Sequence, residues 1–167
     1  MKNGKLLMNY GLIKNKMSLK FDFTNETNQK VGDSVFKPLF ERFTKVLSKK
    51  ISEILKKKNG KISLIIVDDK KIHKINKEYR NVDKPTDVIS FEYMEDRSAV
   101  YGGSEVVVGD IFISLDTAKR QAEEHHHSLQ KELGILFVHG LLHVIGFDHN
   151  DDKEEKQMEK WAKKVLE

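Results

Sequence analysis

Four short segments of the chain carry the apolar patterns that are typical of β-strands. Residues 19–25 (LKFDFTN) alternate between apolar and polar side chains, as a half-buried strand does. Residues 61–69 (KISLIIVDD) are rich in β-branched side chains. The other two predicted strands are residues 87–93 and 106–114, and Gly109 lies inside the last of them.

Apolar residues at three-to-four-residue spacing predict the helices. Over residues 34–57 this spacing predicts one long amphipathic helix, with Asp33 or Ser34 as its N-cap. Ser128 is expected to cap a later helix, with Glu132 close to the reciprocal position of a capping box. The remaining helices are predicted at residues 69–79, 115–126, 129–145 and 151–166.

The order of these elements predicts one α/β (α+β) domain, in which a single mixed sheet of about four strands is packed by about five helices. Residues 80–87 are expected to form a loop because Pro85 disfavours helix before it. Residues 94–105 form a polar segment that contains glycine. We expect residues 1–17 to be a flexible N-terminal extension and residues 18–167 to be the domain.

The amino-acid composition excludes more kinds of chemistry than the net charge does. The 30 Lys and Arg against 26 Asp and Glu give a net charge of +4, which permits nucleic-acid binding but does not argue for it. Cysteine is absent, so disulfides, thiolate metal sites and cysteine nucleophiles are excluded. No apolar run approaches the roughly 20 residues of a membrane span. The first residues lack the features of a signal peptide, so we expect a cytoplasmic protein.

The segment HGLLHVIGFDH, residues 139–149, predicts a metal site on a buried helix. His139 and His143 are four residues apart, so they share one helix face. Gly146 can take a left-handed conformation that ends the helix and brings His149 back toward the same point. Three imidazoles leave a fourth position open, which is the catalytic arrangement for Zn²⁺.

The same spacing occurs in the metzincin peptidases, whose motif is H-E-x-x-H-x-x-G-x-x-H. In this chain Gly140 stands where the peptidase has its glutamate base, so a zincin-like metal helix remains without the proteolytic base. Asp148 stands next to His149, where it could orient an imidazole, approach the metal-bound water or cap the turn.

Three consecutive histidines, His125, His126 and His127, end the helix predicted at 115–126. Partly cationic imidazoles suit a solvated helix C-terminus. Consecutive helical residues point in different directions, so the three cannot converge on one metal ion. We therefore expect them to lie outside the site.

Three segments of the sequence resemble the YbeY family of bacterial endoribonucleases. HGLLHVIGFDH is similar to the family pattern H-G-x-L-H-L-x-G-Y-D-H, with departures at Val144 and Phe147. EYRNVDKPTDVISF at 78–91 and VGDIFIS at 108–114 resemble two further family blocks. The resemblance runs from about residue 18 to the C-terminus.

This resemblance implies a zinc-dependent, single-strand-specific endoribonuclease of the α/β class. It implies action on the 3′ region of small-subunit ribosomal RNA and a part in ribosome quality control. It implies that His139, His143 and His149 hold the zinc and that Arg80 is the family's functionally required arginine. The partners that it implies are the small ribosomal subunit and a ribosome-assembly GTPase.

A phosphodiester is a chemically suitable substrate because a metal ion and a guanidinium can stabilise its transition state without a carboxylate base. The hypothesis is that zinc activates water, or through it an RNA hydroxyl, while Arg80 binds the phosphate. Lys84 is a candidate RNA contact, and Asp87 and Asp110 are candidates for a supporting role. Further lysines that could form a basic rim are Lys49, Lys50 and Lys56 to Lys58.

Two alternatives stay open at this point. The first is a zinc peptidase of metzincin-like type, which Gly140 and the missing secretion signal disfavour. The second is a non-catalytic, zinc-stabilised ribosome assembly factor, for which the same three histidines would suffice.

Overall fold

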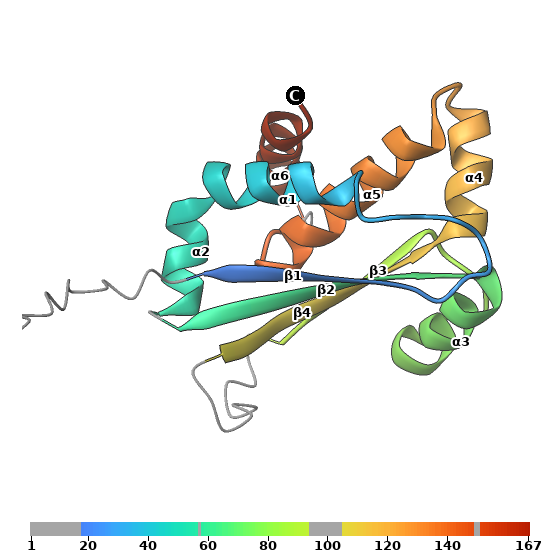
Figure 1. The fold of residues 1–167 in the computed structure, drawn as a ribbon, viewed down its shortest axis with the longest axis horizontal. Coiled ribbons are helices and arrows are strands. Elements are labelled where there is room, and N and C mark those ends of the chain that lie inside the picture. The colour runs from blue at the N-terminus through green and yellow to red at the C-terminus, as the bar shows by residue number, and fades with distance from the viewer. Residues whose placement is uncertain (1–17, 57, 94–104, 149–150) are drawn as a thin grey trace, which may run out of the picture.

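The computed structural model describes residues 18–56, 58–93, 105–148 and 151–167 (Figure 1). It contains four strands, β1 (Leu19–Asn25), β2 (Asn59–Val67), β3 (Val88–Glu92) and β4 (Glu105–Ser114). Its helices are α1 (Phe36–Val46), α2 (Ser48–Leu55), α3 (Asp69–Arg80), α4 (Leu115–Glu124), α5 (Leu129–Val144) and α6 (Asp152–Leu166). No helix among these residues is long and apolar enough to cross a membrane. The expectations for residues 1–17 and 94–104 lie outside the described residues.

All four strands form one mixed sheet in the order β1-β2-β4-β3. β1, β2 and β4 are parallel, and helices make the crossovers between them. β3 pairs antiparallel with β4 and forms an edge of the sheet. The predicted fold class, a single mixed four-stranded sheet with packed helices, is confirmed.

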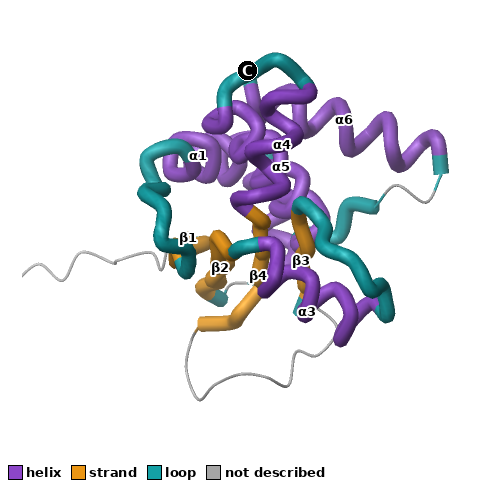
Figure 2. The backbone as a smooth tube through the Cα atoms, turned by 90° about the vertical axis from the view of Figure 1, so that its right-hand side faces the viewer, coloured by secondary structure: helices purple, strands orange, loops and turns teal. Residues whose placement is uncertain are grey.

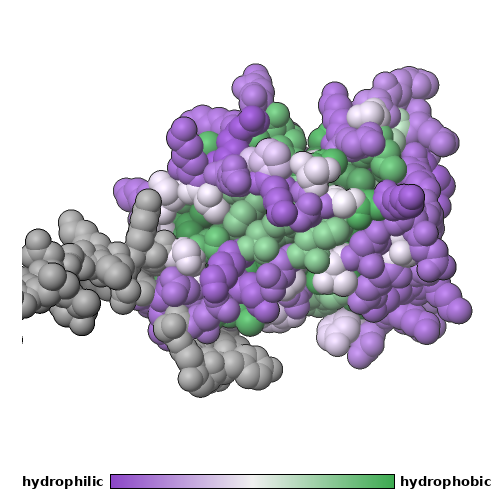
Figure 3. Space-filling model, viewed as in Figure 1, coloured by the Kyte–Doolittle hydropathy of each residue, from purple (hydrophilic) through white to green (hydrophobic). Residues whose placement is uncertain are grey.

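Helices cover the two faces of the sheet unequally. Figure 2 shows α3 beneath the sheet and α1, α4, α5 and α6 above it. The upper layer contains the main core, into which Phe36, Phe43 and Phe137 are fully buried. A smaller cluster of Val67, Ile72 and Ile89 lies under α3. The face in Figure 3 shows apolar side chains in the middle of the molecule, bordered by polar ones.

The single helix predicted at 34–57 is wrong, because the chain bends at Leu47 and forms α1 and α2. Leu47 has φ −107° and ψ 20° and is buried. A straight helix of this length would measure roughly 36 Å, whereas a nine-residue strand such as β2 measures roughly 30 Å. The bend keeps Ile51 and Leu55 in the core instead of carrying them past the end of the sheet.

Two glycines allow α5 to lie unusually close to β4. A Cβ on Gly140 of α5 would meet Ile111 Cγ2 of β4 at 2.7 Å. A Cβ on Gly109 of β4 would meet Val144 Cγ1 of α5 at 2.6 Å and the Phe91 carbonyl oxygen at 2.3 Å. Each element therefore places a β-branched side chain against a glycine of the other. Neither glycine leaves room for a larger residue.

A carboxylate network fixes α3 to the start of α4. Asp69 accepts hydrogen bonds from Ser114, from Thr117 Oγ1 at 2.7 Å and from an Arg120 guanidinium nitrogen at 2.8 Å. Burial raises the pKa of Asp69, but these hydrogen bonds outweigh burial and hold the pKa below its ordinary value. The network anchors the first turn of α3, the helix that ends at Arg80.

Gly140→Ala is expected to destabilise the protein by about 1–3 kcal/mol, because the new methyl group must push Ile111 and the strand apart. Gly134→Ala is the matched control on the same helix, since its Cβ meets only Leu39 Cδ1, at 3.1 Å. Alanine also favours helix over glycine by up to about 1 kcal/mol at both positions. Chemical denaturation of the two variants measures the difference, and equal stabilities would contradict the close packing.

Asp69→Asn is expected to lower the free energy of unfolding at neutral pH by roughly 1–2 kcal/mol, because charged hydrogen bonds are lost at a partly exposed site. The folded pKa lies below the unfolded value of about 3.9. The contribution is therefore present above that value and disappears as the pH falls through the folded pKa.

Denaturation between pH 7 and pH 3 tests this linkage, with the stability gap between wild type and variant closing at the acidic end. Asp22→Asn removes an exposed ion pair with Lys61 and serves as the control. A gap that stays constant over the whole range would show that ionisation of Asp69 does not carry the effect.

Candidate functional site

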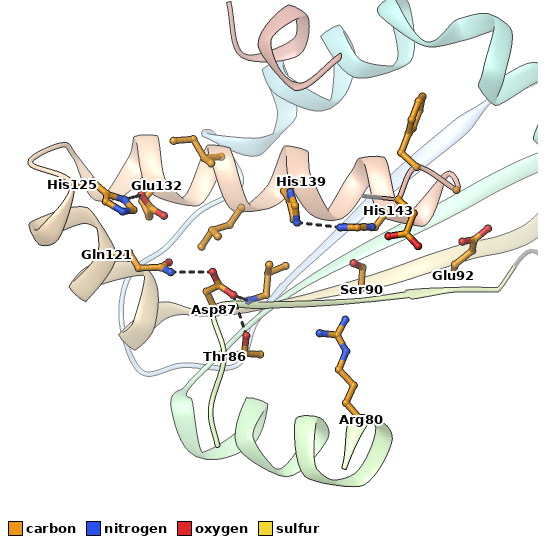
Figure 4. A pocket seen from close by; sticks show the side chains of 16 residues that line it. Arg80, Thr86, Asp87, Ser90, Glu92, Gln121, His125, Glu132, His139 and His143 are labelled. Carbon is orange, nitrogen blue, oxygen red and sulfur yellow. Dashed lines mark hydrogen bonds and ion pairs between the residues drawn. The ribbon is translucent and has the colours of Figure 1, made fainter. Parts of the chain in front are cut away.

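A cleft of about 890 Å³ lies between α5 and the edge strand β3 (Figure 4). Its walls come from the end of α3, the segment 86–92, α4, α5 and the turn after α5. The lining residues are Arg80, Thr86, Asp87, Val88, Ser90, Glu92, Gln121, His125, Glu132, Ile135, Leu136, His139, His143, Gly146, Phe147 and Asp148. The cleft therefore brings together residues from both of the longer resemblance segments.

His139 and His143 face one another along the α5 wall of the cleft (Figure 4). Their Nε2 atoms lie 3.1 Å apart, and the ring centroids are 4.6 Å apart at an interplanar angle of 79°. Both side chains are half-buried. The four-residue spacing thus places the two rings at one point, as the pattern predicted.

The separation of these two nitrogens fits two ligands of a single ion. Nitrogen ligands stand about 2.0–2.1 Å from zinc, so two of them at a tetrahedral angle are roughly 3.3 Å apart. The observed 3.1 Å needs only a small adjustment to reach that value.

The turn after α5 follows the predicted geometry. Gly146 has φ 82°, and its backbone N–H donates to the His143 carbonyl. Phe147 N–H donates to the Leu142 carbonyl, which closes the helix end. Asp148 is exposed and lines the cleft. His149 lies outside the described residues.

Arg80 approaches the cleft from the side opposite α5, and Figure 4 shows its guanidinium directed toward β3 and the histidines. Its placement in a loop is wrong, because Arg80 is the last residue of α3. The helix continues to this point because Asn81, with φ 57°, caps it in the left-handed conformation. Lys84 is exposed and is not among the residues that line the cleft.

Asp87 has a supporting position that its neighbours explain. Its carboxylate accepts hydrogen bonds from Val88 N–H at 2.7 Å, from Thr86 Oγ1 at 3.1 Å and from Gln121 Nε2 at 3.0 Å. These bonds tie the start of β3 to α4 within the lining of the cleft.

Asp110 lies away from the cleft lining and accepts a hydrogen bond from the Tyr93 hydroxyl at 3.1 Å. Burial and the Asp110 charge raise the pKa of Tyr93 to about 12, so Tyr93 stays protonated at neutral pH. Asp87 and Asp110, the two candidates for a supporting role, therefore have different surroundings.

We expected the three consecutive histidines to lie outside the site, but the structure places one of them, His125, in the lining of the cleft. The His125 Nδ1 lies 3.3 Å from Glu132 Oε2, while His127 Nε2 contacts the same oxygen. The physical reason is that α4 ends at Glu124, two residues earlier than expected, and His126 takes a left-handed φ of 53°. His125 and His127 are therefore turn residues, and the directional rule for helices does not apply to them.

Glu132 also departs from the predicted capping box. Ser128 caps α5 as expected and accepts from Lys131 N–H, but Glu132 is the fourth helical residue, one beyond the reciprocal position. Its buried carboxylate faces the two imidazoles instead. The ligand atoms of His125, His127 and Glu132 lie within 4.8 Å of one another, so this group could bind a metal ion.

A sequence signal for this cluster existed. Ser128 predicts the start of a new helix, which leaves His125 to His127 as the turn between two helices rather than as a helical end. The pattern H-x-H followed five residues later by Glu then places two imidazoles and a carboxylate around one turn.

The charges of the cleft are unbalanced. Four lining residues are carboxylates, and Arg80 is the one lysine or arginine among the lining residues. With neutral histidines the lining carries three negative charges in excess. A polyanion can enter such a cleft only if bound cations supply positive charge.

The comparisons with known proteins agree on one family. The profile of the family described as Endoribonuclease YbeY matches residues 22–167. A protein of Pelotomaculum thermopropionicum named Endoribonuclease YbeY is 43% identical over 75% of this chain and 86% of its own length. One of Bacillus pumilus with the same name is 41% identical over 90% of this chain and 94% of its own length.

A solution structure of a Thermotoga maritima protein has a similar fold. It superposes with a TM-score of 0.55 at 24% identity and covers 87% of this chain and 89% of that protein.

Proposed function

The chain belongs to the Endoribonuclease YbeY family, and on that premise we propose that it is a zinc-dependent endoribonuclease specific for single-stranded RNA. We propose further that it acts in the cytoplasm on the 3′ region of small-subunit ribosomal RNA, and in ribosome quality control. The observation that carries the proposal is the pair of facing imidazoles at His139 and His143, 3.1 Å apart, across the cleft from Arg80. The catalytic unit comprises residues 18–167.

His139, His143 and His149 would hold the zinc. The two described rings support this assignment through their separation and through their position in the cleft wall. A zinc ion at this point supplies Lewis acidity and lowers the pKa of the water that it binds. The buried helix α5 holds both rings in place, which removes the need to order flexible side chains when substrate binds.

Arg80 binds the phosphate. Its planar guanidinium can donate two parallel hydrogen bonds to non-bridging oxygens, and it carries its charge at every relevant pH. Its place at the end of α3, opposite the histidines, lets a phosphodiester lie between them. Asp148, at the same end of the cleft, is proposed to orient a ligand or a reacting group, and Lys84 to contact RNA outside the cleft.

The peptidase alternative meets a packing obstacle. The motif position of the proteolytic base is Gly140, where a Cβ would run into Ile111 of β4. A side chain at this position points into the sheet rather than into the cleft. The residue that would make this helix a peptidase helix therefore has no space.

The assembly-factor alternative uses the same fold and the same histidines without chemistry. Under either reading, the proposed partners are the small ribosomal subunit and an assembly GTPase. The two readings differ in whether the cleft must turn over RNA. Rescue of a strain that lacks the gene by His143→Ala, with no RNA hydrolysis by either protein, would favour the assembly role.

Arg80→Ala is expected to lower kcat/KM for single-stranded RNA by about 10²–10³-fold, because transition-state charge loses its guanidinium partner. Metal content, measured on the same samples, should not change. Arg42→Ala is the control, since Arg42 lies on α1 and bonds the Val165 carbonyl, far from the cleft wall. Full cleavage by metal-replete Arg80→Ala would refute the role of Arg80.

His139→Ala is expected to lose one bound divalent ion per chain together with RNA cleavage. An ion at 100 times its Kd stabilises a protein by about 2.7 kcal/mol, so thermal unfolding with and without Zn²⁺ reports the loss directly. His73→Ala is the control, because His73 of α3 pairs with Asp83 in the loop that follows and does not line the cleft. Zinc-dependent cleavage of casein by the wild type, rather than of RNA, would reverse the assignment in favour of a peptidase.

A further inference from the structure

The cluster of His125, His127 and Glu132 lies at the end of the cleft away from the loop that follows α5 (Figure 4). We propose that these three residues hold a second divalent transition-metal ion, and that this ion binds a phosphate of the RNA strand. The metal-binding part of the proposal depends only on the cluster itself, and the phosphate-binding part rests on the proposed function.

The turn between α4 and α5 is built to bring the three ligands together. His126 is held at φ 53°, a conformation that ordinary side chains rarely adopt, and this reversal directs its two neighbours to the same side. Ser128 then starts α5 by accepting from Lys131 N–H, which places Glu132 one turn into the helix. The Glu132 side chain is only 4% exposed, so its carboxylate is held in position.

A buried carboxylate needs compensation, which imidazole N–H groups or a bound cation can supply. Both ring nitrogens approach the same oxygen, Glu132 Oε2. Two histidines and one carboxylate are a recurrent ligand set of catalytic zinc and non-haem iron sites, which leaves other coordination positions open. The 3.3 Å between His125 Nδ1 and Glu132 Oε2 equals the spacing of two ligands around such an ion.

The chemistry of the ligands also selects the ion. Imidazole suits zinc, copper, iron and nickel, whereas magnesium and calcium prefer oxygen ligands. A first-row transition ion is therefore the expected occupant.

The two metal positions are too far apart to act on one phosphate. Glu132 and His139 are seven residues apart on α5, which corresponds to roughly 10 Å along the helix axis. Paired ions that share a reacting phosphate are about 3.5–4 Å apart. The second ion would therefore bind a neighbouring phosphate of the same strand and position the RNA instead of cleaving it.

The negative charge of the cleft lining indicates a role for this second ion. The lining has four carboxylates against the single guanidinium of Arg80, and one divalent ion near His139 does not neutralise them. A second divalent ion reverses the sign of the cleft and lets a phosphate chain lie along α5. His125 and Glu132 both line the cleft, so the open coordination positions are accessible from it.

The second metal site is tested by counting the metal ions bound per chain. Metal-free full-length protein is titrated with Zn²⁺ and separately with Co²⁺, and bound metal is measured after gel filtration, with calorimetry for affinity. We expect two ions per chain in the wild type, one in Glu132→Gln, one in His127→Ala and one in His139→Ala. One ion in the wild type, or two in both Glu132→Gln and His127→Ala, overturns the proposal.

Two variants separate metal binding from folding and from hydrogen bonding. Glu132→Gln keeps the shape and accepts hydrogen bonds from the imidazoles, but it is a much weaker metal ligand. His126→Asn keeps a residue that tolerates the left-handed conformation and removes the one of the three consecutive imidazoles that is outside the cluster, so it should still bind two ions. Loss of the second ion in His126→Asn would assign it to a different ligand set.

The phosphate half of the proposal is tested by kinetics on a single-stranded RNA oligonucleotide. His127→Ala with one ion bound is expected to raise KM about 10-fold and to change kcat less than about 3-fold, because the ion holds substrate away from the scissile bond. Unchanged KM despite the lost ion would refute this half. A wild type that binds two ions but does not cleave RNA would support the second metal site. That result would refute the proposed endoribonuclease function instead.

Discussion

The close approach of α5 to β4 is the constraint on which the site depends. Gly140 of the helix receives Ile111 of the strand, and Gly109 of the strand receives Val144 of the helix. Because each contact needs a glycine on one side, the helix can take only one height and one rotation above the sheet. That rotation turns His139 and His143 toward the edge strand β3, and the cleft opens between α5 and β3.

The same packing explains why a metal-binding helix of zincin type need not be a peptidase helix. Position 140 faces the strand, so a base there would be driven into Ile111. Positions 139 and 143 face the cleft, where Arg80 arrives from α3 on the other side. The network around Asp69 fixes the first turn of that helix to the start of α4, so helices on opposite faces of the sheet position the two halves of the site.

Electrostatics links the histidines to the substrate. A cleft lined by four carboxylates and one guanidinium is unsuited to RNA by itself, and becomes suited when imidazoles hold cations in it. Metal ions would then contribute charge as well as reactivity. Two groups of candidate metal ligands share the α5 wall: His139 and His143 lie near its C-terminal end, and Glu132 meets the preceding turn near its N-terminal end.

The sequence by itself determined the local elements and the four-residue spacing that brings His139 and His143 together. Every strand, and the helices α3 and α5 apart from their exact ends, follow from patterns that are local in the chain, such as alternation, caps and four-residue spacing. Only the tertiary structure decided the rest. Three features depend on it: the bend at Leu47, the convergence of His125 and His127 on Glu132, and the position of Arg80 across the cleft. They arise from contacts between segments distant in sequence, or from a helix that ends two residues early. Local periodicity does not encode such contacts, because they depend on which surfaces meet when the sheet and helices pack.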